Sequence, residues 1–340
     1  MRGPNVSDMG KSVDHCNVSN AVTYDVLSGV VIGQFVLGLP LNLSVLYVFI
    51  FKFKFWKNRS VFLFNIVVAD FLLVACLPSK AYSYTLGQRR NPNYSLCKAM
   101  HFMLFLNRGA SIAFLVTLSL DRYFNVVHLG RRNFVKVLKK SPEISVVIWL
   151  LLLPLAIPAT LHSFECCNSL GRNSTFHQTL TDIFRETVFF SQIIPPFIIL
   201  LYCTVRIVHR LRKKTVGEKA KLRRAMYVVA WVVVIFSVCF LPSTVARAAL
   251  LVVRLKKWEE VEEVVVQFYD ALMVLSYTDC LLDPLVYCFC YSGFKDAYLD
   301  TFCPSFLYKR LRKEGTPSSS NMTTSKSRST SLPMIEKLQV

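Results

Sequence analysis

Residues 100–123 read MHFMLFLNRGASIAFLVTLSLDRY, an apolar run with a single arginine deep inside it. About 20 predominantly apolar residues are enough to cross a bilayer as a helix. A charge near the centre of such a span costs about 2.5–3.5 kcal/mol on insertion scales, so it faces protein or water and usually marks a functional site. Because Arg108 has no acidic residue near it in the sequence, we expect it to bind an anionic ligand.

The rest of the chain repeats this apolar pattern. Of its 340 residues 53% are hydrophobic, which is too many for a soluble domain of this length. Lipid offers no hydrogen-bond partner to the backbone, which favours helices, and the sequence lacks the alternating segments of about 10 residues that a β-barrel needs. We predict an all-α membrane protein, a seven-transmembrane helix bundle with spans near 22–51, 60–84, 96–128, 143–163, 183–211, 222–253 and 264–291.

The basic residues predict the orientation of these spans. The formal net charge is +19, and Lys and Arg cluster after the first, third, fifth and seventh spans. The positive-inside rule places these clusters in the cytoplasm and the N-terminus outside. Since the basic residues are tied to membrane edges, nucleic-acid binding has little support. The clusters include Lys54, Arg132, Lys213 and Arg312.

Glycosylation sequons and cysteines agree with this orientation. Four sequons fall on the predicted outer side, where glycosylation occurs; their asparagines are Asn5, Asn17, Asn93 and Asn173. The extracellular space also permits disulfides. The cysteines predicted to lie there are Cys16, Cys97, Cys166 and Cys167.

Short motifs recur along the spans in a fixed order. They are Asn65, Asp70, the triplet 121–123, Trp149, the pair 195–196, the stretches 239–242 and 283–287, and Phe294 on a short amphipathic segment. In order and spacing this set resembles the rhodopsin-like family of G-protein-coupled receptors. The resemblance covers about residues 22–303. It implies the seven-helix fold with a short amphipathic eighth helix, plasma-membrane localisation, and heterotrimeric G protein and arrestin as partners.

A narrower resemblance concerns the ligand. The segment LFLNRGASIAFLVTLSLDRYFNVVH, residues 104–128, is similar to the third helix of the hydroxycarboxylic acid receptors and the related oxoeicosanoid receptor. This resemblance implies that Arg108 holds a ligand carboxylate and that the coupling partner is an inhibitory G protein. Arg247, Tyr277 and Ser169 match other pocket positions of that group. The ligand is then either a small hydroxycarboxylic acid or an oxidised fatty acid.

The chemistry of these side chains is consistent with an acidic ligand. A guanidinium binds a carboxylate through two parallel hydrogen bonds, which lysine cannot do. Arg247 lies five residues after Pro242, about 7.5 Å nearer the outside, and Tyr277 lies about 10 Å outward of Pro284 on a continuous helix. The alternatives are an ion pair of Arg108 with Asp70 or Asp279, snorkelling of Arg247 to the interface, and a packing role for Tyr277.

A further polar constellation is predicted in the middle of the bundle. It consists of Asp70, Asn107, Ser111, Asp279 and Asp283. Three carboxylates this close need a proton or a cation between them. The resemblance implies a sodium pocket here and no other cofactor; the alternative is a hydrogen-bond network that joins helices.

The resemblance also assigns the cytoplasmic switch to a set of motif residues. Arg122 pairs with Asp121 at rest and turns toward the G protein on activation. The usual acid that latches this arginine is missing, because residues 221–224 read KLRR, so we predict basal signalling. The whole switch set is Asp121, Arg122, Tyr123, Asp283, Pro284 and Tyr287.

Covalent sites and the chain termini complete the prediction. The resemblance implies that Cys97 bonds a cysteine of the second outer loop, and Cys167 fits the family register better than Cys166. A bridge from the spare cysteine to Cys16 is a separate hypothesis. Cys303 follows the short amphipathic segment, and juxtamembrane cysteines can be palmitoylated. We expect an extracellular tail over 1–21, a receptor domain over 22–303 and a disordered cytoplasmic tail over 304–340. Phosphorylation of the Ser- and Thr-rich part of that tail would create an acidic strip for arrestin.

The sequence lacks the features of two other classes of protein, transporters and enzymes. An organic-anion transporter predicts internal repeats and broken helix pairs in matching halves, and the sequence has neither. An enzyme has no support, since the His-Glu-x-x-His and Gly-x-Ser-x-Gly patterns are absent. The receptor therefore remains the leading hypothesis.

Overall fold

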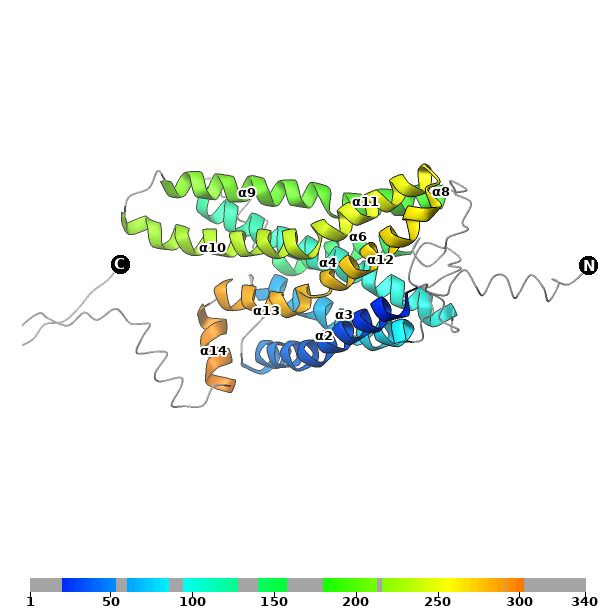
Figure 1. Ribbon diagram of the computed structural model, residues 1–340. Helices are drawn as coiled ribbons and strands as arrows, with labels where there is room; N and C mark the ends of the chain where they lie inside the picture. Colours follow the sequence, from blue (N-terminus) through cyan, green and yellow to red (C-terminus); the bar gives the residue numbers. More distant parts are fainter. Residues whose placement is uncertain are drawn as a thin grey trace, which may run out of the picture.

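The computed structural model describes residues 20–52, 60–85, 94–127, 140–157, 180–212, 216–290 and 292–302. Within these ranges all regular elements are helices, and they run side by side as a bundle (Figure 1). The predicted all-α class is therefore confirmed. Several predicted sites lie outside the described residues or have undescribed side chains: Asn5, Asn17, Asn93, Asn173, Cys16, Cys97, Cys166, Cys167, Ser169 and Cys303.

The helices follow the predicted spans in order. The first four spans correspond to α2 (Ala21–Tyr47, extended by the π-turn η1, Val48–Lys52), α3 (Ser60–Thr85), α4 (Tyr94–Val127) and α6 (Ser141–Ala156). The last three are each formed by two helices: α8 (Leu180–Ser191) with α9 (Ile194–Arg212), α10 (Val216–Cys239) with α11 (Leu241–Leu255), and α12 (Glu259–Ser276) with α13 (Asp279–Cys290). The predicted eighth helix is α14 (Ser292–Phe302).

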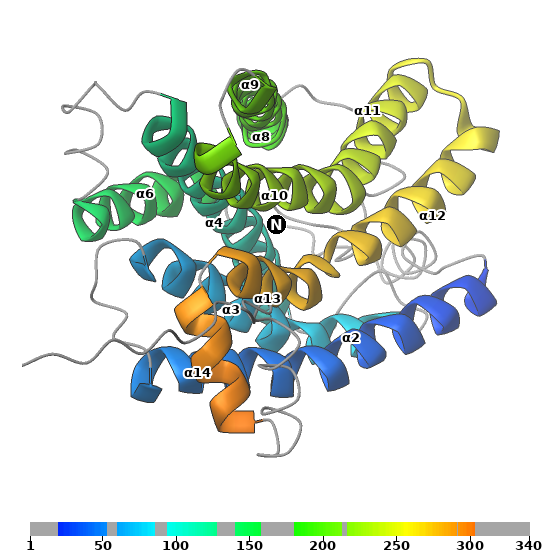
Figure 2. The same ribbon diagram turned by 90° about the vertical axis from the view of Figure 1, so that its left-hand side faces the viewer.

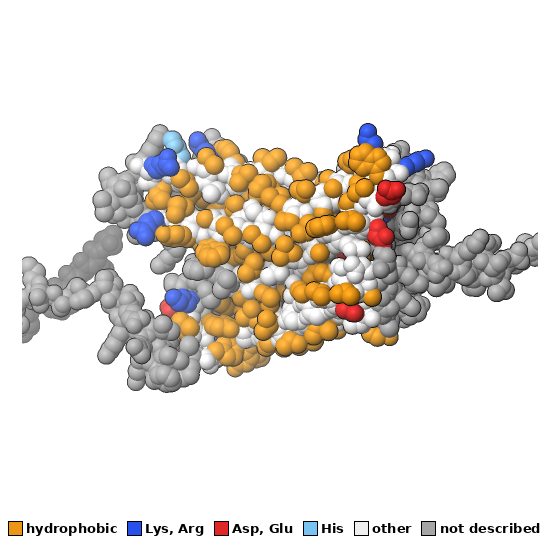
Figure 3. Space-filling model, viewed as in Figure 1, with side chains coloured by type: hydrophobic (Ala, Val, Ile, Leu, Met, Phe, Trp, Pro, Cys, Tyr) orange, Lys and Arg blue, Asp and Glu red, His pale blue; other side chains and the backbone are white. Residues whose placement is uncertain are grey.

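Membrane-compatible length is found in six of the seven predicted spans. Six helical stretches in the described chain are long and apolar enough to cross a bilayer. The fourth span is shorter as described, because α6 has 16 residues and the description stops at residue 157. Charged side chains gather at the two ends of the visible face, and an apolar belt covers the middle (Figure 3). This distribution fits a lipid-facing surface, on which apolar side chains need no protein cover.

Two of the helix breaks have a proline beside them. Pro242 has no N–H to donate to the preceding turn, and α10 gives way to α11 just before it. Pro195 follows the break between α8 and α9 in the same way. The break between α12 and α13 falls at Tyr277 and Thr278, although Pro284 lies inside α13. Tyr277 therefore lies at the junction of α12 and α13, and its predicted 10 Å offset from Pro284 stays a prediction.

The third span is the central helix of the bundle. About 72% of the apolar window of α4 is buried, a larger share than in any other span of the described chain. Viewed from the end, α4 runs among α3, α6, α9 and α10 (Figure 2). Gly109 allows this close packing, since a β-carbon there would lie 2.9 Å from the Leu152 side chain and 3.0 Å from Gln192. The helix that carries Arg108 thus contacts most of the other spans.

Candidate ligand-binding pocket

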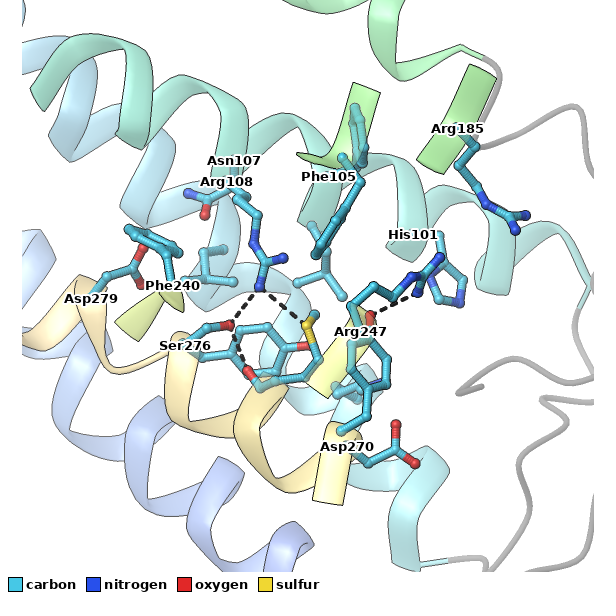
Figure 4. Close-up of a pocket in the computed structure, with 17 residues that line it drawn as sticks. His101, Phe105, Asn107, Arg108, Arg185, Phe240, Arg247, Asp270, Ser276 and Asp279 are labelled. Carbon is cyan, nitrogen blue, oxygen red and sulfur yellow. Dashed lines mark hydrogen bonds between the residues drawn. The ribbon is translucent and has the colours of Figure 1, made fainter. Parts of the chain in front are cut away.

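A cavity opens between α3, α4, α8, α11 and α12 (Figure 4). It lies in the half of the bundle that contains α8, α11 and the start of α2 (Figure 1). Its volume is about 1040 Å³ when the space open to solvent is included. Leu73, Leu104 and Phe105 give it apolar walls, and several charged side chains project into it. A mainly apolar pocket with a few convergent polar groups is typical of a small-molecule site.

Arg108 lies deep in this cavity and is only 6% exposed. Its Nη2 donates to the Ser276 hydroxyl at 3.0 Å and reaches the Ser243 hydroxyl at 3.4 Å. The guanidinium carbon also lies 5.8 Å from the centre of the Phe240 ring, a cation–π distance. Among the described residues, no carboxylate lies within ion-pair distance of Arg108. The alternative of an ion pair with a nearby aspartate is therefore wrong for this structure.

Arg247 also lines the cavity, but its charge is already paired. Its Nη2 and Nε donate to the two carboxylate oxygens of Glu186 at 2.5 and 3.0 Å, and its Nη1 donates to the Tyr269 hydroxyl at 2.9 Å. This is the bidentate geometry that a guanidinium forms with a carboxylate. Arg247 is 8% exposed, so the snorkelling alternative is wrong. The sequence analysis missed Glu186, although it is the only acidic residue in the predicted fifth span.

One aromatic ring lies against both Arg108 and Arg247. The guanidinium carbons of Arg108 and Arg247 each lie 5.2 Å from the centre of the Phe189 ring. Phe189 belongs to α8, as does Glu186, so this short helix supplies both the shared ring and the counter-charge of Arg247. Arg185 of α8 also lines the cavity, and its Nη2 lies 3.2 Å from Glu186 Oε1. Glu186 therefore pairs with two of the three arginines at the cavity, Arg185 and Arg247, while Arg108 has no carboxylate partner among the described residues.

Tyr277 and two polar side chains that the sequence analysis did not single out complete the wall. Tyr277 is 4% exposed and lies where α12 ends, beside the cavity. Lys80 of α3 and Asp270 of α12 also line the cavity and are 4% and 1% exposed. The Tyr24 hydroxyl of α2 donates to Asp270 Oδ2 at 2.7 Å. Nothing in the local sequence indicates this grouping, because its members come from three separate helices.

The predicted central constellation is buried, and two of its members, Asn107 and Asp279, also line the cavity. Asp70 accepts a hydrogen bond from the Tyr287 hydroxyl at 3.1 Å, and Asp279 accepts one from the Cys280 N–H at 2.8 Å. Both carboxylate oxygens of Asp283 and the Ser111 hydroxyl have no hydrogen-bond partner in the described structure.

These orphaned oxygens suit a hard cation, which prefers carboxylate and carbonyl ligands. However, no three His, Cys, Asp or Glu side chains of the described ranges converge as a metal cluster. A cation here would have to use hydroxyl or amide ligands beside the carboxylates. Asn107 could bind a cation only through Oδ1, because its Nδ2 is a donor and donates to the backbone oxygen of Ala69.

The predicted switch lies at the opposite end of α4. Asp121 is buried and accepts a hydrogen bond from the Asn125 amide at 2.8 Å, and Arg122 beside it is half-buried. Tyr123 packs with Cys203 of α9 and Val229 of α10. The triplet thus lies where three spans meet, and its role in switching stays a prediction.

Comparison with known proteins identifies the family of this chain. Residues 41–287 match the family model described as 7 transmembrane receptor (rhodopsin family). This chain belongs to that family. The resemblance deduced from the motifs is confirmed, and the protein is a G-protein-coupled receptor, not an enzyme. Membership implies a multi-pass membrane location, coupling to a G protein and a small ligand.

Individual relatives cover most of the receptor. The mouse 12-(S)-hydroxy-5,8,10,14-eicosatetraenoic acid receptor is 31% identical over 290 residues, which is 84% of this chain and 91% of the relative. Human hydroxycarboxylic acid receptor 2 is 32% identical over 288 residues, 83% of this chain and 78% of the relative. Human oxoeicosanoid receptor 1 is 28% identical, covering 82% and 73%.

Proposed function

We propose that this receptor responds to a carboxylic acid whose carboxylate binds Arg108 from the cavity. The observation that carries the proposal is a buried guanidinium at the base of an open pocket, held by neutral hydroxyls and by no acid within the described chain. An uncompensated buried charge is costly, and an arriving carboxylate supplies both the missing charge and two hydrogen bonds. Arg108 and Tyr277 are the primary ligand-binding residues, and Ser169 stays part of the proposed set.

Two classes of acid fit this proposal. The relatives are named as receptors for hydroxycarboxylic acids and for oxidised eicosanoids. A small hydroxycarboxylic acid would bind at Arg108 alone. The Leu and Phe walls of the cavity favour the second class, an oxidised fatty acid whose chain extends toward the outer end.

Activation would proceed by a population shift. A ligand favours the active state only through tighter binding to that state. Ser243 on α11 and Ser276 on α12 both contact Arg108, so a carboxylate that competes for this guanidinium changes what holds α4 to these two helices. We propose that the shift reaches the cytoplasmic end through α4 and couples to an inhibitory G protein.

Orientation and modifications are proposed together. Exposed Lys and Arg side chains gather at the end where α9 meets α10 (Figure 3), which supports a cytoplasmic location for that end. We propose a plasma-membrane receptor with an extracellular N-terminus, sequon glycosylation and arrestin binding to the cytoplasmic tail. Disulfides at Cys97–Cys167 and Cys16–Cys166, palmitoylation of Cys303, and the three predicted domain boundaries are part of the same proposal.

A sodium ion as a modulator is proposed on narrower grounds. The orphaned oxygens of Asp283 and Ser111, with Asp70 nearby, offer the oxygen ligands that a hard cation needs. Bound there, sodium would supply positive charge among buried carboxylates. The side chains of Asp283, Ser111 and Asp70 would hold the ion.

The test is G-protein activation by straight-chain carboxylic acids of graded length, each paired with its methyl ester. Membranes carrying the wild type and Arg108→Ala are compared by guanine-nucleotide exchange. We expect the acids to activate the wild type, the esters to fail, and Arg108→Ala to raise the half-maximal concentration about 100-fold, as expected for a lost charge-assisted bidentate pair.

Arg254→Ala is the matched control. Arg254 is a second arginine on α11, 10% exposed at its side chain, that does not line the cavity. Its removal should leave the acid response unchanged. An acid response that survives Arg108→Ala, or that is lost equally in Arg254→Ala, would refute the assignment.

A further inference from the structure

We propose that Lys80 and Asp270 form a second binding subsite, one that recognises a hydroxyl group on the body of the ligand. The subsite lies outward of the carboxylate site at Arg108. The inference rests on the proposed function, because it concerns the same cavity and the same ligand. Its grounds are the burial of the two side chains, their access to the cavity, and their complementary charges.

Three helices build this corner of the pocket. Asp270 of α12 and Lys80 of α3 both line the cavity, and both are at most 4% exposed. Tyr24 of α2 donates its hydroxyl to Asp270 Oδ2 at 2.7 Å, which fixes the carboxylate. The Lys80 ammonium lies 4.9 Å above the ring of Tyr84. Charged side chains in a span are held there by partners of this kind and usually mark function.

The position along α12 sets the spacing between the two subsites. Ser276, which contacts Arg108, and Asp270 are six residues apart on this helix. At 1.5 Å per residue the separation along the axis is about 9 Å. Figure 4 shows Asp270 displaced from Arg108 toward the outer end of the pocket. A ligand that reaches both subsites therefore needs several carbon atoms between its carboxylate and its second polar group.

The pairing of charges selects the chemistry of that group. An ammonium only donates hydrogen bonds and a carboxylate only accepts them, whereas a hydroxyl does both. A hydroxyl can therefore accept from Lys80 and donate to Asp270. A second carboxylate would meet the like charge of Asp270, and an amine would meet that of Lys80. A site with buried polar partners also discriminates against a ligand that lacks the hydroxyl.

A purely structural ion pair between α3 and α12 makes a different prediction. Loss of a structural pair lowers the amount of folded receptor and affects all ligands equally. Loss of a subsite removes the preference for the hydroxylated ligand and spares the response to the plain acid. The ratio of the two half-maximal concentrations separates these cases, because it does not depend on how much receptor reaches the membrane.

The experiment compares a long-chain unsaturated fatty acid with its mid-chain monohydroxy derivatives, the hydroxyl being moved along the chain. The wild type should prefer one positional isomer over the plain acid by about five- to tenfold, the range for one net buried hydrogen bond. In Lys80→Met and in Asp270→Asn this ratio should fall toward one. Tyr24→Phe removes the hydrogen bond from Tyr24 to Asp270 without altering the cavity wall, so it should reduce the ratio partly.

Ser28→Ala is the structural control. The Ser28 hydroxyl donates to the Ala81 backbone at 3.0 Å and joins α2 to α3 away from the cavity. This variant should keep the full preference for the hydroxylated acid. A wild type that responds to acids without preferring any hydroxylated isomer, or a preference that survives both Lys80→Met and Asp270→Asn, overturns the subsite while leaving Arg108 intact. An unchanged acid response in Arg108→Ala would instead overturn the proposed function.

Discussion

Arg108 and Arg247 differ in the groups that surround them, and this difference sets the charge of the pocket that a ligand enters. Arg247 is neutralised by Glu186 in a bidentate pair, while hydroxyls and aromatic rings surround Arg108. Phe189 lies against both guanidiniums. Arg185 also lines the cavity and shares Glu186 with Arg247, so Arg108 is the cavity arginine without a carboxylate partner among the described residues, which suits a monocarboxylic acid. Glu186 acts as an internal substitute for a second ligand carboxylate.

Glu186→Gln should change the selectivity of the pocket. The substitution keeps the size of the side chain but removes the carboxylate charge that Arg247 and Arg185 share, so a second ligand carboxylate gains a partner. We expect the response to dicarboxylic acids, relative to monocarboxylic acids of equal length, to rise about tenfold. Guanine-nucleotide exchange with the two acid series measures this ratio.

Glu262→Gln provides the matched control for this prediction. Arg254 and Glu262 form a pair at 3.0 Å with side-chain exposures of 10% and 14%, close to the 10% and 13% of Arg247 and Glu186. This second pair does not line the cavity. Equal ratios in the two variants would mean that Glu186 has no part in selectivity.

At the scale of the elements, the breaks in the last three spans decide what the pocket contains. The break before Pro242 leaves Phe240 beneath Arg108 and starts α11, which carries Ser243 and Arg247. The short helix α8 ends before Pro195 and carries Phe189 and Glu186, the ring and the acid that contact Arg247. At the other end of the bundle, α14 is held by aromatic contacts. Phe294 stacks on Phe49 with ring centres 4.7 Å apart.

Phe294→Ala should destabilise the cytoplasmic end of the receptor. Phe294 is fully buried against Phe49 and Tyr287, so its removal leaves a cavity that costs about 3–5 kcal/mol. Thermal unfolding of the detergent-purified receptor should show a clear fall in Tm. Phe302→Ala on the same helix, at a side chain that is 49% exposed, should have a much smaller effect. Similar falls in both variants would show that packing of Phe294 does not anchor α14.

At the scale of the whole molecule, the bundle connects an outer pocket to a cytoplasmic triplet through α4. Arg108 and Arg122 lie 14 residues apart on this helix, about 21 Å along its axis. The α4 helix is the most buried span of the described chain. This helix therefore links the groups around Arg108 to α9 and α10, against which Tyr123 packs, and it is the route that we propose for activation.

The missing latch on α10 leads to a prediction about the resting state. Residues 221–224 contain no acid to hold Arg122, so the inactive state lacks one stabilising ion pair. Leu222→Glu should lower ligand-free signalling about two- to fivefold, the effect of a pair worth about 0.5–1 kcal/mol. Nucleotide exchange without ligand measures it, with Leu222→Gln as the uncharged control. Unchanged basal activity in Leu222→Glu would count against a missing latch.

The sequence by itself determined the features that depend on local composition. The positions of the spans, the all-α class and the family follow from hydropathy and from short motifs, and Arg108 stands out because a charge in an apolar run is visible in one segment. The basic clusters predict the side of the membrane in the same way, and this orientation stays a proposal. These signals need no knowledge of which helices touch.

Only the tertiary structure decided which side chains meet. The partner of Arg247 is Glu186, 61 residues away, and Tyr24 reaches Asp270 across 246 residues. The seventh span breaks at Tyr277 and not at its proline. Such contacts depend on the faces that distant helices present to one another. The sequence of one segment does not indicate which helices pack against it. The charge state of the pocket is therefore a property of the assembled bundle.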